Sequence, residues 1–176
     1  QALVLEKTGD PSKARAAFEQ FLKEYPEHTQ ALEVHFRLGK LLEGQGAGEE
    51  AQAELKAFVQ QTEKKENKNR AEALYLLGKI QGTAKNYDAA LAHFEKLLDE
   101  GAGLYEEEAL NLSATWYTLR NKFDEAAAKL NLLRNRKDTK LAEDAAYKIA
   151  AVWLKAEKPD LAIAANPLNA MAYASR

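Results

Sequence analysis

Pairs of small residues recur along this 176-residue chain, and the two members of each pair are always twelve positions apart. The first member lies in one apolar stretch and the second, an alanine, lies in the next. The five pairs are Ala2/Ala14, Gly39/Ala51, Gly78/Ala90, Ala114/Ala126 and Ala150/Ala162. The alanines follow one another at intervals of 37, 39, 36 and 36 residues. A fixed period of about 20–50 residues indicates stacked repeating units rather than one closed core.

The stretch 71–98 shows the repeating unit most clearly. Mostly apolar residues recur three and four positions apart, which is the spacing of one helical face. The first such set is Leu74, Leu77, Gly78 and Gln81, and the second runs from Tyr87 to Leu98. The stretch therefore predicts two amphipathic helices joined by a short turn. Gly78 and Ala90 are small where two helices approach closely. Since one hairpin cannot bury both of its apolar faces, neighbouring copies must cover them.

The residues around these markers resemble the tetratricopeptide repeat pattern. The phrases that carry the resemblance are Leu77-Gly78 with Ala90-x3-Phe94, Leu38-Gly39 with Ala51-x3-Leu55, and Ala14-x3-Phe18 ending in Pro26. The resemblance covers about Ala2 to Ala165. It implies an all-α, right-handed superhelical solenoid of antiparallel helix hairpins, with about 4.5 repeats.

We expect a single repeat domain over residues 1–165, with repeats near 1–26, 29–62, 70–100, 104–136 and 138–165. Residues 166–176 are expected to form an irregular tail, because Asn166-Pro167 disfavours helical continuation and no repeat pattern follows. Gln1 lies inside what should be a first helix, and no signal peptide precedes it. We therefore expect the chain to be a fragment of a longer protein.

Two phrases resemble a particular type of tetratricopeptide repeat. Phe21-Leu22-Lys-Glu-Tyr25-Pro26, followed by Phe36-Arg-Leu-Gly39, is similar to the longer repeats of bacterial envelope proteins. These include the Tol-Pal coordinator and the outer-membrane assembly lipoproteins. The resemblance favours a bacterial protein of the periplasm or cell envelope over a cytoplasmic one, while composition leaves the compartment open.

Composition excludes several classes of function. The net charge of −2 and the pI near 6.0 argue against a nucleic-acid-binding surface. No run approaches the ~18 apolar residues of a membrane span, so we expect no membrane insertion. The absence of cysteine excludes a disulfide framework, a zinc–thiolate site and a thiol nucleophile.

No combination of residues indicates catalysis, a cofactor or a bound metal. The three histidines, His28, His35 and His93, are isolated and have no ligand spacing with a carboxylate. The chain has no Gly-x-Ser-x-Gly elbow, no phosphate-binding glycine loop and no nucleophile with an adjacent base. We expect His35 to be a partly buried structural residue, and we expect no enzyme activity, cofactor or metal.

A partner-binding surface has more support. In a stacked hairpin solenoid the first helices line the concave side, and their exposed face is offset from the buried stripe. The expected groove residues are Phe36, Lys40, Tyr75, Lys79, Asn111, Thr115 and Tyr147. An aromatic residue followed four positions later by lysine, twice in succession, can hold apolar side chains and pair with acidic groups. Alternatively, these aromatic rings pack between neighbouring repeats and the lysines only solvate the edge.

One known mode of tetratricopeptide recognition is not expected here. Chaperone-binding members of the family hold a peptide's C-terminal carboxylate with lysine and asparagine four positions apart on their first helices. This chain has Phe36/Lys40, Tyr75/Lys79 and Asn111/Thr115 at the corresponding places. The carboxylate clamp is therefore missing, and binding to chaperone tails is not predicted.

The preferred interpretation is a non-enzymatic protein–protein interaction scaffold that binds a partner peptide or helix in the concave groove. The alternative is a self-assembly or spacer module that forms homo-oligomers through its exposed terminal repeats. A third interpretation, regulation of a catalytic domain elsewhere in a longer protein, is compatible with the sequence but cannot be tested from it. The partner and the biological process are left open.

Overall fold

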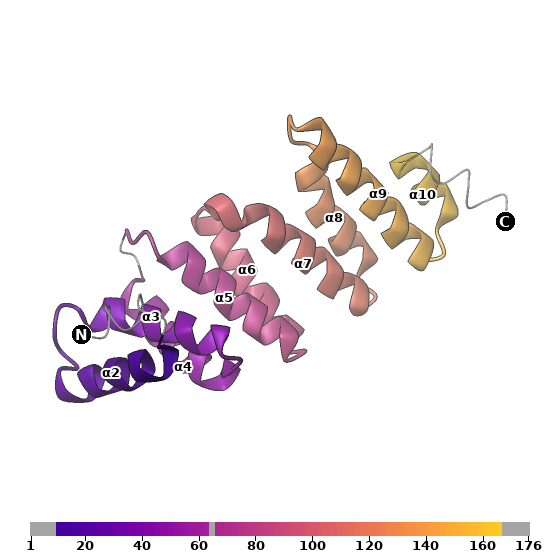
Figure 1. Ribbon diagram of the computed structural model, residues 1–176. Helices are drawn as coiled ribbons and strands as arrows, with labels where there is room; N and C mark the ends of the chain where they lie inside the picture. Colours follow the sequence, from indigo (N-terminus) through magenta and orange to yellow (C-terminus); the bar gives the residue numbers. More distant parts are fainter. Residues whose placement is uncertain (1–9, 64–65, 167–176) are drawn as a thin grey trace. The chain divides into compact units, whose positions relative to one another are not determined.

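The computed structural model describes residues 10–63 and 66–166, and it contains helices and connections but no strand in these ranges (Figure 1). The α-helices are α2 Pro11–Glu24, α3 Ala31–Gly44, α4 Gly48–Gln61, α5 Arg70–Thr83, α6 Tyr87–Glu100, α7 Glu106–Leu119, α8 Phe123–Arg134, α9 Thr139–Lys155 and α10 Pro159–Ala165. A 3-10 turn, η1 Gly103–Tyr105, precedes α7. The all-α fold of helix hairpins expected from the sequence is confirmed.

The chain divides into two compact units, Gln1–Gly101 and Ala102–Arg176. Unit 1 holds α2 and the hairpins α3/α4 and α5/α6, and unit 2 holds the hairpins α7/α8 and α9/α10. The division lies beside Gly101 and Gly103, whose φ angles of 99° and 53° suit a residue without a Cβ atom. The single domain over 1–165 stays a prediction, and the tail from Pro167 onward lies outside the described residues.

The small residues that mark the repeats in the described hairpins lie at tight contacts between the paired helices. All five second-helix alanines, from Ala14 to Ala162, are fully buried at 0% exposure. A Cβ atom on Gly78 would lie 2.3 Å from Cε1 of Phe94, and one on Gly39 would lie 2.6 Å from Cγ of Leu55. No side chain larger than hydrogen fits at either glycine without displacing its neighbour.

The constant separation of the markers follows from one repeated turn. The turn of each described hairpin has one residue in the left-handed region, with φ of 77° at Gly46, 63° at Lys85, 57° at Asn121 and 58° at Glu157. Each lies seven positions after the small residue and five before the alanine. The next N–H donates to the carbonyl five residues earlier, as Asn86 does to Gln81 at 2.9 Å. This Schellman geometry ends the first helix of each described hairpin at the same place.

In unit 1, Arg70 joins three helices through a buried guanidinium group. Its Nε and Nη2 atoms donate to the two carboxylate oxygens of Glu100 at 2.6 and 2.9 Å. Its Nη1 atom donates to the carbonyl of Val59 at 2.5 Å and to Oγ1 of Thr62 at 2.9 Å. The start of α5 is thereby fastened to the ends of α4 and α6. These charge-assisted hydrogen bonds raise the pKa of Arg70 and lower that of Glu100.

Candidate partner-binding groove

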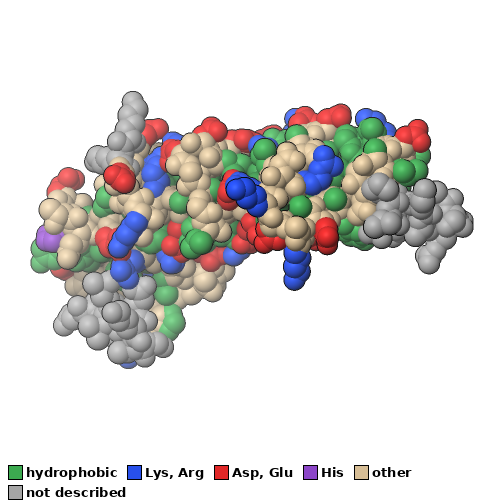
Figure 2. Space-filling view, turned by 90° about the horizontal axis from the view of Figure 1, so that it is seen from above, with side chains coloured by type: hydrophobic (Ala, Val, Ile, Leu, Met, Phe, Trp, Pro, Cys, Tyr) green, Lys and Arg blue, Asp and Glu red, His purple; other side chains and the backbone are tan. Residues whose placement is uncertain are grey.

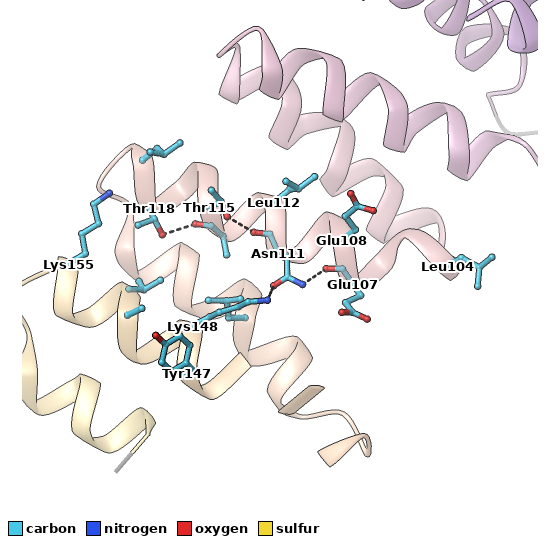
Figure 3. Close-up of a pocket in the computed structure, with 15 residues that line it drawn as sticks. Leu104, Glu107, Glu108, Asn111, Leu112, Thr115, Thr118, Tyr147, Lys148 and Lys155 are labelled. Atoms are coloured by element: carbon cyan, nitrogen blue, oxygen red, sulfur yellow. Dashed lines mark hydrogen bonds between the residues drawn. The ribbon is translucent and has the colours of Figure 1, made fainter. Parts of the chain in front are cut away.

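Unit 2 contains a groove of about 800 Å³ between its two first helices, α7 and α9 (Figure 3). Three of the residues expected from the sequence line it, namely Asn111 and Thr115 from α7 and Tyr147 from α9. Leu130 of α8 also lines the groove. A volume near the upper end of the usual range of about 300–1,000 Å³ for ligand sites is large enough to receive several side chains.

Large apolar side chains are exposed along this groove. Leu104 is 97% exposed, Leu119 is 52% exposed and Tyr147 is 49% exposed, and all three line it. On the face shown in Figure 2, hydrophobic side chains reach the surface between acidic and basic ones. Exposed apolar groups gathered in one concave place are typical of an interaction site, whereas single scattered ones are ordinary.

A hydrogen-bond network holds the two walls of the groove together. Nζ of Lys148 on α9 donates to Oδ1 of Asn111 on α7 at 2.8 Å, and it also pairs with Asp144 at 2.5 Å. Nδ2 of Asn111 donates to the backbone carbonyl of Glu107 at 3.0 Å. Asn111 is therefore committed to positioning the walls, and its amide is turned toward the protein.

The threonine hydroxyls of α7 also bond within the helix. Oγ1 of Thr115 donates to the carbonyl of Asn111 at 3.0 Å, and Oγ1 of Thr118 donates to that of Ala114 at 2.7 Å (Figure 3). A hydroxyl has one proton to donate and two lone pairs. The hydroxyl protons are used inside α7. Towards a ligand, these threonines can therefore present only the lone pairs of their hydroxyl oxygens and their methyl groups.

Charged side chains mark the two ends of the groove. Glu107 and Glu108 lie at the end where α7 begins, near Leu104, and Lys155 lies at the opposite end near Thr118 (Figure 3). The repeat pattern of the sequence does not by itself identify Lys148, Lys155 or Leu104 as groove residues. The signal that could have found Lys155 is the spacing of four that continues from Tyr147 through Ala151 along α9.

The structure corrects the expected position of two aromatic rings in unit 1. Phe36 and Tyr75 are only 4% and 7% exposed. The ring of Phe36 packs on Phe58 with centroids 5.1 Å apart, and that of Tyr75 stacks on Phe94 at 6.1 Å with an interplanar angle of 8°. Each ring thus packs inside its own hairpin, because both fill space left between the paired helices. The expected exposed aromatic ladder is not formed at these two positions.

The two lysines expected beside those rings form ion pairs that tie α3 to α5. Nζ of Lys40 lies 2.6 Å from Glu72, and Nζ of Lys79 lies 3.0 Å from Glu43. Lys40 also lies over the ring of Phe36, 5.3 Å from its centroid. The face of unit 1 that corresponds to the groove is therefore bridged twice by opposite charges.

The same repeat positions explain why unit 2 is open. Counted from the small markers, Thr115 and Ala151 occupy the places of the two lysines, and Thr118 occupies the place of Glu43. None of these three side chains can form an ion pair across the helices. Short neutral residues therefore leave a hollow where unit 1 has charged bridges.

Within the described ranges, no cluster of three or more His, Cys, Asp and Glu residues could hold a metal ion. Nδ1 of His35 lies 2.6 Å from Oε2 of Glu54, so this partly buried histidine links α3 to α4 as a structural residue would. Burial lowers the pKa of His93, and the nearby Lys56 and Lys96 lower it further. No described helix has the length and apolar character needed to cross a membrane.

Comparison with solved structures shows the fold. The chain is similar to MamA, with a TM-score of 0.73 and 19% identity over 99% of this chain and 96% of that one. It is also similar to YrrB, described as a TPR protein with an unusual peptide-binding site, with a TM-score of 0.70 and 16% identity over 99% and 89% of the two chains. A tetratricopeptide repeat protein from Parabacteroides merdae matches with a TM-score of 0.66 and 16% identity over 93% and 74%. The resemblance to envelope proteins stays a prediction.

Comparison with models of sequence families shows which family the chain is related to. No curated protein matches the chain. The model of the tetratricopeptide repeat matches residues 1–63 and 36–105, which together exceed half of the 176 residues. Proteins of this family generally mediate protein–protein interactions and are typically non-enzymatic. The family match and the hairpin fold agree, and the chain belongs to the tetratricopeptide repeat family.

Proposed function

We propose that this chain is a non-enzymatic scaffold that binds a peptide or helix of a partner protein in the groove between α7 and α9. The observation that carries the proposal is the open groove itself, lined by the exposed side chains of Leu104, Leu119 and Tyr147. Burying such groups against a partner is the main source of affinity in protein interfaces.

The groove residues have different parts in this proposal. Tyr147 supplies a large ring with few rotatable bonds, a type of side chain that frequently dominates binding energy. Thr115 and Thr118 accept hydrogen bonds from the partner's backbone N–H groups. Asn111 acts indirectly, because its bond to Lys148 fixes the spacing of the walls.

The corresponding face of unit 1 is proposed by itself as a polar contact surface. Lys40 and Lys79 stay partly exposed despite their ion pairs, so their ammonium groups can also meet acidic groups of a partner that binds this face. Exposed ion pairs are worth about 0–1 kcal/mol, so exchanging one for a contact with the partner costs little. Phe36 and Tyr75 support this face from beneath without touching the partner.

A groove-blocking variant with a matched control tests the proposal. Ala151→Arg places a long side chain in the groove, whereas Ala128→Arg makes the same change at an exposed alanine of α8 that does not line it. The wild type and both variants are used as bait for affinity capture with quantitative mass spectrometry. We expect a partner that is lost with Ala151→Arg and retained with Ala128→Arg. Equal capture by all three baits would contradict the groove assignment.

Self-association is a second candidate function, favoured by the exposed Leu161 on the short helix α10. A second copy of the chain can cover this exposed apolar side chain. Light scattering distinguishes the two functions. A molar mass that stays at one chain across a hundredfold range of concentration would eliminate self-association.

A further inference from the structure

We propose that the occupant of the α7/α9 groove is an extended segment with an apolar centre, a basic residue at one end and an acidic residue at the other. This inference rests on the proposed function and specifies the chemistry of the partner. It follows from the order of charges along the groove, in which Glu107 and Glu108 lie at one end and Lys155 at the other.

The acidic end has two carboxylates that no basic side chain neutralises among the described residues. Glu106, beside them in the first turn of α7, pairs with Arg136, but Glu107 and Glu108 form no such pair there. Both side chains are exposed and line the groove. A lysine or arginine of the partner meets opposite charge at this end, and an acidic residue there would be repelled.

The basic end is formed by Lys155 in the last turn of α9. Its side chain is exposed and forms no ion pair within the part of the chain that the structure describes. The other lysine of the groove, Lys148, is occupied by Asp144 and Asn111. The centre of the groove is therefore electrically balanced, while its ends carry opposite charges.

The centre of the groove suits apolar side chains. Leu112, Ala151 and Val152 line it together with the ring of Tyr147. A charged residue of the partner placed there would lose hydration without gaining an unpaired opposite charge. The middle of the occupant is accordingly apolar.

Helix geometry sets the spacing of the charges. Lys155 has the same repeat position on α9 as Leu119 on α7, since each lies five residues after its small marker. The rise from Glu107 to Leu119 is about 18 Å at ~1.5 Å per residue. An extended chain spans that distance in about five or six residues. The basic and acidic residues of the occupant are therefore about five or six positions apart.

Selection from a random dodecapeptide library, displayed on phage, tests this inference. With the wild-type protein we expect enriched peptides with one basic and one acidic residue at that spacing around an apolar centre. Binding of these peptides should weaken roughly tenfold or more for the double variant Glu107→Lys/Glu108→Lys. Peptides whose basic residue is replaced by glutamate should bind this variant better than they bind the wild type.

Matched controls separate the charge effect from general electrostatics. Asp124→Lys/Glu125→Lys makes the same charge change in the first turn of α8, away from the groove, and should leave peptide affinity unchanged. Lys155→Glu should weaken binding, whereas Lys137→Glu should not. Circular dichroism establishes that each variant is folded, and recovery with the charge-swapped peptides shows that the groove is intact.

Each outcome decides one of the two proposals. One outcome is that selected peptides fail to bind the Ala151→Arg protein and yet bind the Glu107→Lys/Glu108→Lys and Lys155→Glu proteins as tightly as the wild type. This result would overturn the charge inference and leave the proposed function in place. Peptides insensitive to Ala151→Arg would overturn the proposed function itself. Self-association that Ala151→Arg abolishes would identify a second copy of this chain as the occupant and would also overturn the inference.

Discussion

Replacing Gly78 with alanine adds one methyl group at a tight contact between α5 and α6. In a helix interior this change normally stabilises by about 1 kcal/mol, because alanine has the higher helix propensity. Here the new Cβ atom would lie 2.3 Å from Cε1 and 2.5 Å from Cδ1 of Phe94. The ring cannot move aside cheaply, since it is fully buried and stacked on Tyr75.

The steric overlap between the added methyl group and the Phe94 ring decides whether Gly78→Ala stabilises or destabilises the fold. Overpacking a core costs about 1–3 kcal/mol, and a contact this short is at the upper end of that range. After the gain in propensity, we expect a net loss of about 1–2 kcal/mol. For a chain of this length the loss corresponds to a fall in Tm of about 2–8 °C.

Gly44 supplies the control for this measurement. It is the last residue of α3, and a Cβ atom there would meet nothing within 4 Å. Gly44→Ala should therefore raise the stability by about 0.5 kcal/mol, in the direction that propensity alone predicts. Thermal and urea unfolding followed by circular dichroism compare the two variants. A Gly78→Ala protein as stable as the wild type would refute the packing account of the repeat marker.

Three further variants test other parts of the structure. Arg70→Met should lower the free energy of unfolding by about 2–4 kcal/mol in urea titrations, because it leaves the Glu100 carboxylate without its bidentate partner. An unchanged urea midpoint would show that the pairing of Arg70 with Glu100 is dispensable for stability. Lys85→Gly should raise Tm by a few degrees, since the left-handed turn residue favours glycine by about 1 kcal/mol, and a lower Tm would contradict this. Burial lowers the pKa of His93, so below the ordinary value of 6.5 the unfolded chain binds the proton more readily and stability falls. His93→Gln should therefore lose less stability than the wild type between pH 7 and pH 5, and equal losses would argue against a buried neutral imidazole.

The repeat itself could be predicted from the sequence because it depends on local rules. Small residues are required where helices touch, and their period fixes the phase of each hairpin, which is why the buried positions of Ala90 and Ala162 are confirmed. The start of α2 was predictable for the same reason. Asp10 accepts a hydrogen bond from the N–H of Lys13, and Pro11 occupies the first helical position.

The exposure of the aromatic residues could not be predicted, because it depends on a partner from another helix. Residues three positions before the marker lie about 60° from it around the helix. A ring at that angle is buried if it can pack on a second ring from the paired helix, as Tyr75 packs on Phe94. The position equivalent to Phe94 in the last hairpin is Asn166, one residue beyond the end of α10. Tyr147 therefore has no ring to stack on there, and it lies half exposed in the groove.

The burial of Arg70 and its hydrogen bonds between helices could not be predicted from the sequence either. Arg70 ends the polar and highly charged run 63–70, and such runs are usually solvated. Its burial depends on the convergence of Val59, Thr62 and Glu100 from two other helices. Only the packed hairpins bring these groups together.

Site-specific photocrosslinking tests most directly whether the groove between α7 and α9 receives a partner. A benzophenone amino acid placed at position 151 reports on the groove, and the same group at position 128 reports on exposed α8 in the same unit. The account predicts that the partner captured by the wild-type chain crosslinks from position 151 and not from position 128. A partner that crosslinks from position 128 alone would place the binding surface elsewhere and contradict the account.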